Sequence, residues 1–224
     1  MPAVPAYTRT MLFPKLLAAL LVVAVTVPSA AERTLSLSEV DEAIRLGQTR
    51  IAADRSRFHA PYRLEVGQPP VDYIETVTPY RRVVLAAEHS AQAGERTFGQ
   101  RQALQLLTEA DGQFDAVVEM TFHPLNTFVT MPAYEVVLMR GAVRVTPASL
   151  DRQARFGARV EGLPPPIPLV GGQIRGGTSQ PILGGTVTAR FKGEDVEPRA
   201  ALDLAVFDGD KELLRVKIDL GRLR

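Results

Sequence analysis

Residues 122–134 hold the chain's densest group of chemically useful side chains, with a histidine, an asparagine and three aromatic rings. His123 can act as a general acid or base, and Asn126 and Tyr134 can hold a ligand by hydrogen bonds. The segment links two predicted strands, and loops on a rigid scaffold often carry binding chemistry. The favoured interpretation is a packed corner in which Asn126 or His123 bonds main-chain groups. The functional hypothesis is a site for a ligand or partner.

Two adjacent arginines, Arg81 and Arg82, occupy the first turn of a predicted helix that begins at Thr78-Pro79. The helix dipole disfavours cations there, so their presence calls for a compensating group. Two guanidiniums beside unpaired N–H groups could bind a carboxylate or phosphate. The simpler interpretation is a salt bridge from Arg81 to Glu75 or Glu65 in the preceding strands.

Neither a metal site nor a catalytic motif is apparent. The chain has no cysteine, and its three histidines, at positions 59, 89 and 123, do not share metal-ligand spacing. The alternating acids of 208–212 suit a hairpin turn better than a calcium site. Gly-x-Ser-x-Gly, P-loop, His-Glu-x-x-His and dinucleotide motifs are missing. We therefore assign no catalytic residue, metal or cofactor, and an enzyme is the less favoured class.

The first 31 residues have the form of a secretory signal peptide. Arg9 and Lys15 precede the apolar run 16–27, and small residues lead to a cleavage point after Ala31. The run is too short to span a bilayer, which needs about 20 residues. We expect a periplasmic or secreted protein with no membrane span after cleavage.

Charge and composition limit the partners. Losing the leader with its two cations changes the net charge from +1 to −1. A nearly neutral chain without a basic block makes nucleic acid an unsuitable partner, because that affinity depends on phosphate neutralisation. Without disulfides, the remaining chain must be held together by its core.

The elements that position these residues begin with helices. Apolar residues at three- and four-residue steps predict one long helix from Ser38 to Ala60, capped by Ser38 and Asp41. A β-hairpin follows over 62–77. Two further helices, 78–94 and 99–110, form a helical hairpin.

After Gly112 the apolar period changes from 3.6 to 2, which indicates strands. We expect them at 116–122, 134–140, 142–146, 155–161, 186–191, 200–207 and 213–220. The predicted class is α+β: N-terminal helices packed with a C-terminal antiparallel β-sandwich or partial barrel. The helical part with its hairpin covers 32–112 and the β-rich part 113–224, with one composite domain favoured over two.

Residues 162–185 form a Gly/Pro-rich segment of low charge. A linker between strands is the favoured interpretation. Its apolar residues, Ile167 and Leu183 among them, support the alternative that it wraps the body or contacts a partner.

These observations favour an exported protein of binding or assembly type, whose partner is another exported protein. It would act through a face or loop of the β-layer, with 122–134 and 162–185 as the first surfaces. One alternative is an exported hydrolase that uses His123 with a carboxylate elsewhere. The other is a small-anion-binding protein at Arg81 and Arg82. Oligomeric state is left open.

Overall fold

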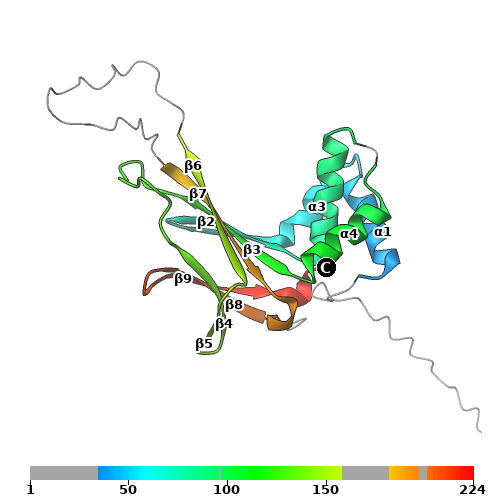
Figure 1. Cartoon of the computed structure of the whole chain (residues 1–224). Coiled ribbons are helices and arrows are strands. Elements are labelled where there is room, and N and C mark those ends of the chain that lie inside the picture. Colours follow the sequence, from blue (N-terminus) through cyan, green and yellow to red (C-terminus); the bar gives the residue numbers. More distant parts are fainter. Residues whose placement is uncertain (1–34, 96, 158–181, 197–200) are drawn as a thin grey trace, which may run out of the picture.

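The computed structural model describes residues 35–95, 97–157, 182–196 and 201–224 (Figure 1). The helices within them are α1 (Leu37–Gly47), α2 (Ala52–His59), α3 (Pro79–Gln92) and α4 (Gln100–Ala110). The strands are β1 (Arg63–Gln68), β2 (Val71–Val77), β3 (Phe114–Thr121), β4 (Glu135–Arg140), β5 (Val143–Val145), β6 (Ser149–Phe156), β7 (Ile182–Phe191), β8 (Ala201–Asp208) and β9 (Lys211–Asp219). The predicted leader, 1–31, and residues 162–181 of the Gly/Pro-rich segment lie outside the described residues.

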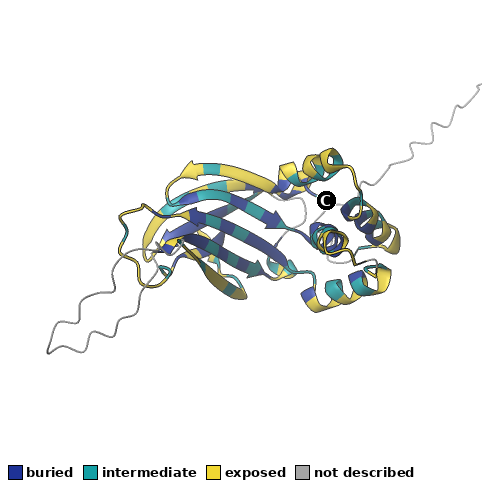
Figure 2. Ribbon diagram, turned by 90° about the horizontal axis from the view of Figure 1, so that it is seen from above, coloured by how far each residue is buried: buried dark blue, intermediate teal, exposed yellow. Residues whose placement is uncertain are grey.

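The strands form two antiparallel sheets that share one apolar core. The five-stranded sheet has the order β1-β2-β3-β7-β6, and the four-stranded sheet has the order β5-β4-β8-β9. Ile74 and Val118 of the first sheet and Val136 and Leu204 of the second are buried in the same cluster. Figure 2 shows the buried residues concentrated along these strands. The predicted α+β class with an antiparallel sandwich is confirmed.

The helices lie at one end of the sheets and have a second core of their own (Figure 1). Val40 and Ile44 of α1 pack with Val83 and Val84 of α3 in this core. The hairpin β1–β2, which precedes α3, is hydrogen-bonded to β3 in the five-stranded sheet. The chain therefore passes directly from β2 into α3, which places the start of α3 beside the sheet.

The predicted long helix from 38 to 60 is wrong in its length, because the chain forms two helices, α1 and α2. Ile51 is one of the apolar residues whose spacing predicted the long helix, but its side chain is exposed and α2 has no buried residue. Packing therefore does not hold α2 in line with α1. The predicted cap is also displaced by two residues: the capping box is formed by Ser36 and Glu39.

Two strand boundaries differ from the prediction. Strand β6 covers 149–156 and so begins six residues before the predicted strand 155–161, of which residues 158–161 lie outside the described residues. Strand β7 begins at Ile182, inside the segment expected to be a linker. Most β6 side chains are exposed, so the strand lacks the apolar alternation that marks a half-buried strand. Gly184 pairs with Thr121 of β3 and Arg155 of β6, and a Cβ atom there would collide with the main-chain oxygen of Met120, so this close pairing requires glycine.

Among the helices of the described residues, none combines the length and the apolar character needed to cross a membrane.

Candidate functional site

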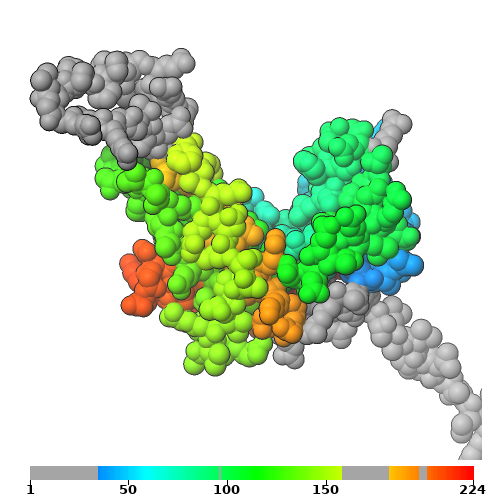
Figure 3. All heavy atoms as spheres, viewed as in Figure 1, coloured from blue at the N-terminus to red at the C-terminus, as the bar shows by residue number. Residues whose placement is uncertain are grey.

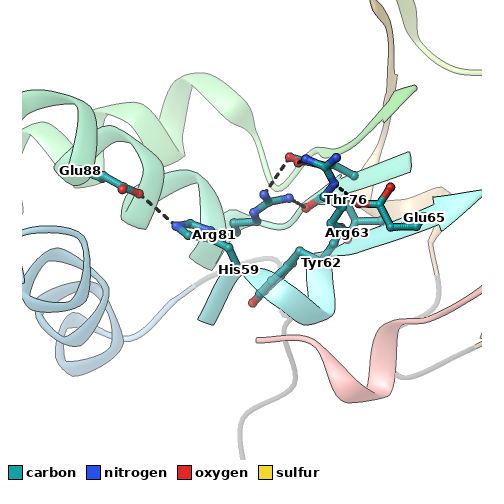
Figure 4. A network of polar contacts seen from close by, with 8 residues as sticks. His59, Tyr62, Arg63, Glu65, Thr76, Arg81 and Glu88 are labelled. Carbon is teal, nitrogen blue, oxygen red and sulfur yellow. Dashed lines mark hydrogen bonds and ion pairs between the residues drawn. The ribbon is translucent and has the colours of Figure 1, made fainter. Parts of the chain in front are cut away.

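Arg81 is held in a buried ion pair at the start of α3. The side chain is 3% exposed, and its Nη2 donates to Glu75 Oε2 at 2.8 Å (Figure 4). Its Nη1 donates to the main-chain oxygen of Thr76 at 2.6 Å. The predicted salt bridge from Arg81 to Glu75 is confirmed. Glu75 supplies the negative charge that a cation in the first turn of a helix requires.

Arg82 is paired with a carboxylate from a different strand. Its Nη2 lies 2.9 Å from Asp115 Oδ2, and Arg190 Nε donates to Asp115 Oδ1 at 3.0 Å. Asp115 is buried, so it connects α3 to β3 and β7 from inside the protein. Both arginines singled out by the sequence thus contact carboxylates, and an external anion would have to compete with them.

His123 and Asn126 shape the turn that follows β3. His123 Nδ1 accepts a hydrogen bond from the N–H of Leu125 at 3.1 Å. The Asn126 amide donates to the main-chain oxygens of His123 and Ile182, at 2.8 and 3.0 Å. Its Oδ1 accepts from the N–H of Phe128 at 3.0 Å. Through these bonds Asn126 stabilises the conformation of this turn.

Tyr134 closes the same connection at the start of β4. Its ring lies against Phe122, with centroids 6.1 Å apart, and burial raises the pKa of its phenol. The main-chain oxygen of Tyr134 accepts two hydrogen bonds from the guanidinium of Arg152 on β6. The connection 122–134 is therefore attached to the core at one end and to β6 at the other.

The structure brings together the two segments that the sequence treats separately. The N–H of Phe122 donates to the main-chain oxygen of Leu183 at 2.9 Å. Gly185 is close to both β6 and the connection, since a Cβ atom there would collide with the main-chain oxygen of Gln153 and lie 2.8 Å from Met131 Sδ. The connection 122–134 and the start of β7 consequently form one surface.

Five exposed apolar side chains gather on that surface, which we call the apolar end. They are Leu125, Phe128, Val129, Phe156 and Leu183. Leu125 is 82% and Val129 77% exposed. Phe156 belongs to it because β6 pairs Phe156 with Ile182, the neighbour of Leu183.

The apolar end is the end of the sheets opposite the helices (Figure 1). Figure 3 shows the connection between β3 and β4, in green, beside the end of β6, in yellow-green. Exposed apolar residues that gather at one end of a fold are candidates for an interaction site. Leu125, Phe128 and Val129 lie within the segment chosen from the sequence, and Leu183 lies within 162–185. Phe156 was missed, because the sequence does not show which strand pairs with the predicted strand 155–161.

Sequence reasoning also missed a group of ion pairs in the helical layer, in which Glu88 contacts His59 and Arg55. His59 Nε2 lies 3.0 Å from Glu88 Oε2, and Arg55 Nε lies 2.9 Å from Glu88 Oε1 (Figure 4 shows the first pair). Glu88 is 29 residues from His59, and no local spacing rule connects them. His89, the neighbour of Glu88, is exposed.

Metal binding and histidine catalysis each require a particular arrangement of side chains. In the parts of the chain that the structure describes, no three His, Asp or Glu side chains converge as metal ligands. Within those parts His123 has no ion-pair partner, and the histidine that contacts a carboxylate is His59.

Comparison with known proteins gives no relative: no family model, no curated protein and no solved structure matches this chain.

Proposed function

We propose that this is an exported protein of binding or assembly type that holds a second exported protein through the apolar end. The observation that carries the proposal is the gathering of Leu125, Phe128, Val129, Phe156 and Leu183, from three segments, on one exposed surface. Export rests on the predicted leader, residues 1–31.

The base of the apolar end is ordered by hydrogen bonds and by packing. Asn126 bonds both its own turn and β7, and Phe128 packs edge-on against the buried ring of Phe122 with centroids 5.1 Å apart. A surface held in place before binding loses little conformational entropy when a partner arrives. This favours a binding surface over a solvent-exposed turn without a role.

The charges beside the apolar end indicate an apolar partner. Arg155 pairs with Glu119 at 3.0 Å, and Thr121 donates to Asp72 at 2.6 Å. Because Arg155 and Glu119 neutralise each other and Asp72 has a hydrogen-bond donor, apolar side chains of a partner can complement this end of the sheets. We therefore assign the partner as a protein that presents an apolar surface.

The geometry gives less support to the two other functions considered. A hydrolase would need an acid to orient His123, and the carboxylates of the described residues lie beyond ion-pair distance of it. An anion-binding protein would need free guanidiniums at Arg81 and Arg82, and both contact carboxylates.

Photo-cross-linking in the source cells tests the proposal. A benzophenone side chain replaces Phe128 in one variant and Ile51 in a control, because Ile51 is also exposed and apolar but lies in the helical layer. We expect a discrete adduct from position 128 that disappears when Leu125→Ser and Val129→Ser are added. The same adduct from position 51, no adduct at either position, or an adduct with a second copy of this chain would overturn the proposal.

A further inference from the structure

A polar cavity of about 530 Å³ lies between the connection from α1 to α2 and the end of α3. Its volume falls within the range of small-molecule sites, about 300–1,000 Å³. Its lining includes two arginines, two glutamates and two glutamines: Arg50, Arg55, Glu88, Glu95, Gln48 and Gln92. This cavity lies in the helical layer, opposite the apolar end, and is independent of the proposed function.

The cavity exists because α1 stops at Gly47 and the chain turns before α2 begins. A Cβ on Gly47 would collide with the main-chain oxygen of Val84 and lie 2.7 Å from Ala87 Cβ. The backbones of α1 and α3 therefore approach closely at this residue. Beyond it α2 is joined to α3 by the side chains of Arg55 and His59, which reach Glu88, and the cavity lies beside this contact.

One wall of the cavity is formed by ion pairs that share Glu88. Glu88 is bonded by Arg55 Nε at 2.9 Å and by His59 Nε2 at 3.0 Å, and its side chain is 18% exposed. Arg55 also donates to the main-chain oxygen of Thr49, and Gln92 donates to Glu88 Oε1 at 3.3 Å. Arg55 and Glu88 thus neutralise each other and form an ordered polar wall.

Among the described residues that line the cavity, one cation and one anion remain for a ligand. Arg50 is exposed and makes no ion pair within the described residues, while Glu95 follows α3 and accepts a 3.4 Å bond from Ser90 Oγ. The ends of α1 and α3 both line the cavity, and the C-terminal end of a helix carries partial negative charge. The side of the cavity that contains Glu95 therefore attracts a cation, and Arg50 attracts an anion.

We propose that this cavity binds a free α-amino acid, with its carboxylate at Arg50 and its ammonium group at Glu95 and the carbonyl groups that end α3. An anion alone would meet Glu95 and two helix C-termini. A cation alone would leave Arg50 without a partner, and an uncharged molecule would leave both Arg50 and Glu95 without one. A zwitterion satisfies both signs of charge.

Titration of the purified chain with each of the twenty free amino acids, followed by NMR and thermal unfolding, tests the assignment. We expect at least one to bind saturably. Its amide, which lacks the carboxylate, and its N-acetyl form, which lacks the ammonium group, should bind at least about tenfold more weakly. If no amino acid binds saturably, or if both blocked forms bind equally well, the assignment is overturned.

Variants place the binding in this cavity. Arg50→Ala and Glu95→Gln should each weaken binding by about tenfold or more. Arg101→Ala and Glu109→Gln serve as matched controls, because both residues are exposed on α4 and neither lines the cavity. Equal affinity in all four variants would contradict the proposal even if an amino acid binds.

Discussion

Arg224 and Glu42 form a two-bond ion pair that connects the last described residue to α1. Arg224 Nη1 and Nη2 donate to Glu42 Oε1 and Oε2 at 2.7 and 2.8 Å. The main-chain oxygen of Arg224 also accepts hydrogen bonds from Tyr62 and from Thr78, the cap of α3. The chain that leaves the four-stranded sheet is thereby attached to the helical layer.

Replacing Glu42 by Gln should lower the free energy of unfolding at neutral pH by about 0.5 kcal/mol, because solvent screens a pair whose side chains are 42% and 44% exposed. The hydrogen bonds from Arg224 lower the pKa of Glu42. A lowered pKa means that the stabilisation is complete above the ordinary carboxyl pKa and is lost as pH falls through the folded value.

Urea unfolding of both forms from pH 7 to pH 3 measures this dependence. The difference between Glu42→Gln and the unchanged chain should shrink on acidification. A difference that stays constant across that range would show that the pair does not supply the stabilisation.

Arg81→Met should destabilise the protein by about 2–3 kcal/mol. The change leaves Glu75 without its 2.8 Å partner and the buried carbonyl oxygen of Thr76 without its donor. Arg63→Met is the matched control, because Arg63 lies 3.8 Å from the same carboxylate and is much more exposed. Urea midpoints compare the two variants, and equal losses would refute a special role for the buried guanidinium.

Gly47→Ala should destabilise the protein by about 1–3 kcal/mol even though alanine is the better helix former. The added methyl group would collide with α3, so the two helices must move apart. Gly99→Ala provides the comparison, because a Cβ there meets Gln102 at an ordinary 3.7 Å. Thermal unfolding distinguishes the two; a neutral Gly47→Ala would contradict the close approach of α1 and α3.

Tyr80→Phe and Tyr62→Phe should have opposite effects. The Tyr80 hydroxyl is buried without a hydrogen-bond partner in the described residues, and burial raises its pKa to about 12. Removing it should leave stability unchanged or raise it by about 1 kcal/mol. The Tyr62 hydroxyl bonds both the N–H and the oxygen of Arg224, so its removal should cost about 1–2 kcal/mol.

Urea unfolding of the two phenylalanine variants measures both effects. A comparable loss of stability in the two would show that the Tyr80 hydroxyl contributes as much as that of Tyr62.

Periodicity predicted the fold class and most strands and helices, because those patterns are local. The contact of Arg81 with Glu75 was predictable for the same reason, since the two residues are six positions apart. The pairing of Arg82 with Asp115 was not, because 33 residues separate them. The length of the first helix was overestimated because periodicity cannot show that Ile51 has nothing to pack against.

The apolar end illustrates the limit of sequence reasoning most directly. Alternation shows which face of a strand is buried but not which strand pairs with which. Phe122 and Leu183 are 61 positions apart, and only the pairing of β3 with β7 brings their segments together. The connection 122–134 could therefore be selected, whereas its union with the start of β7 could not.

The affinity of the purified cross-linked partner for two double variants tests most directly whether the apolar end holds a partner protein. Leu125→Ser with Val129→Ser should weaken binding by about tenfold or more, because these side chains are the most exposed of the apolar end. The control double variant combines Leu37→Ser with Ile51→Ser, two exposed apolar residues of the helical layer. It should bind the partner as tightly as the unchanged chain does. Equal affinities for both double variants would contradict the account.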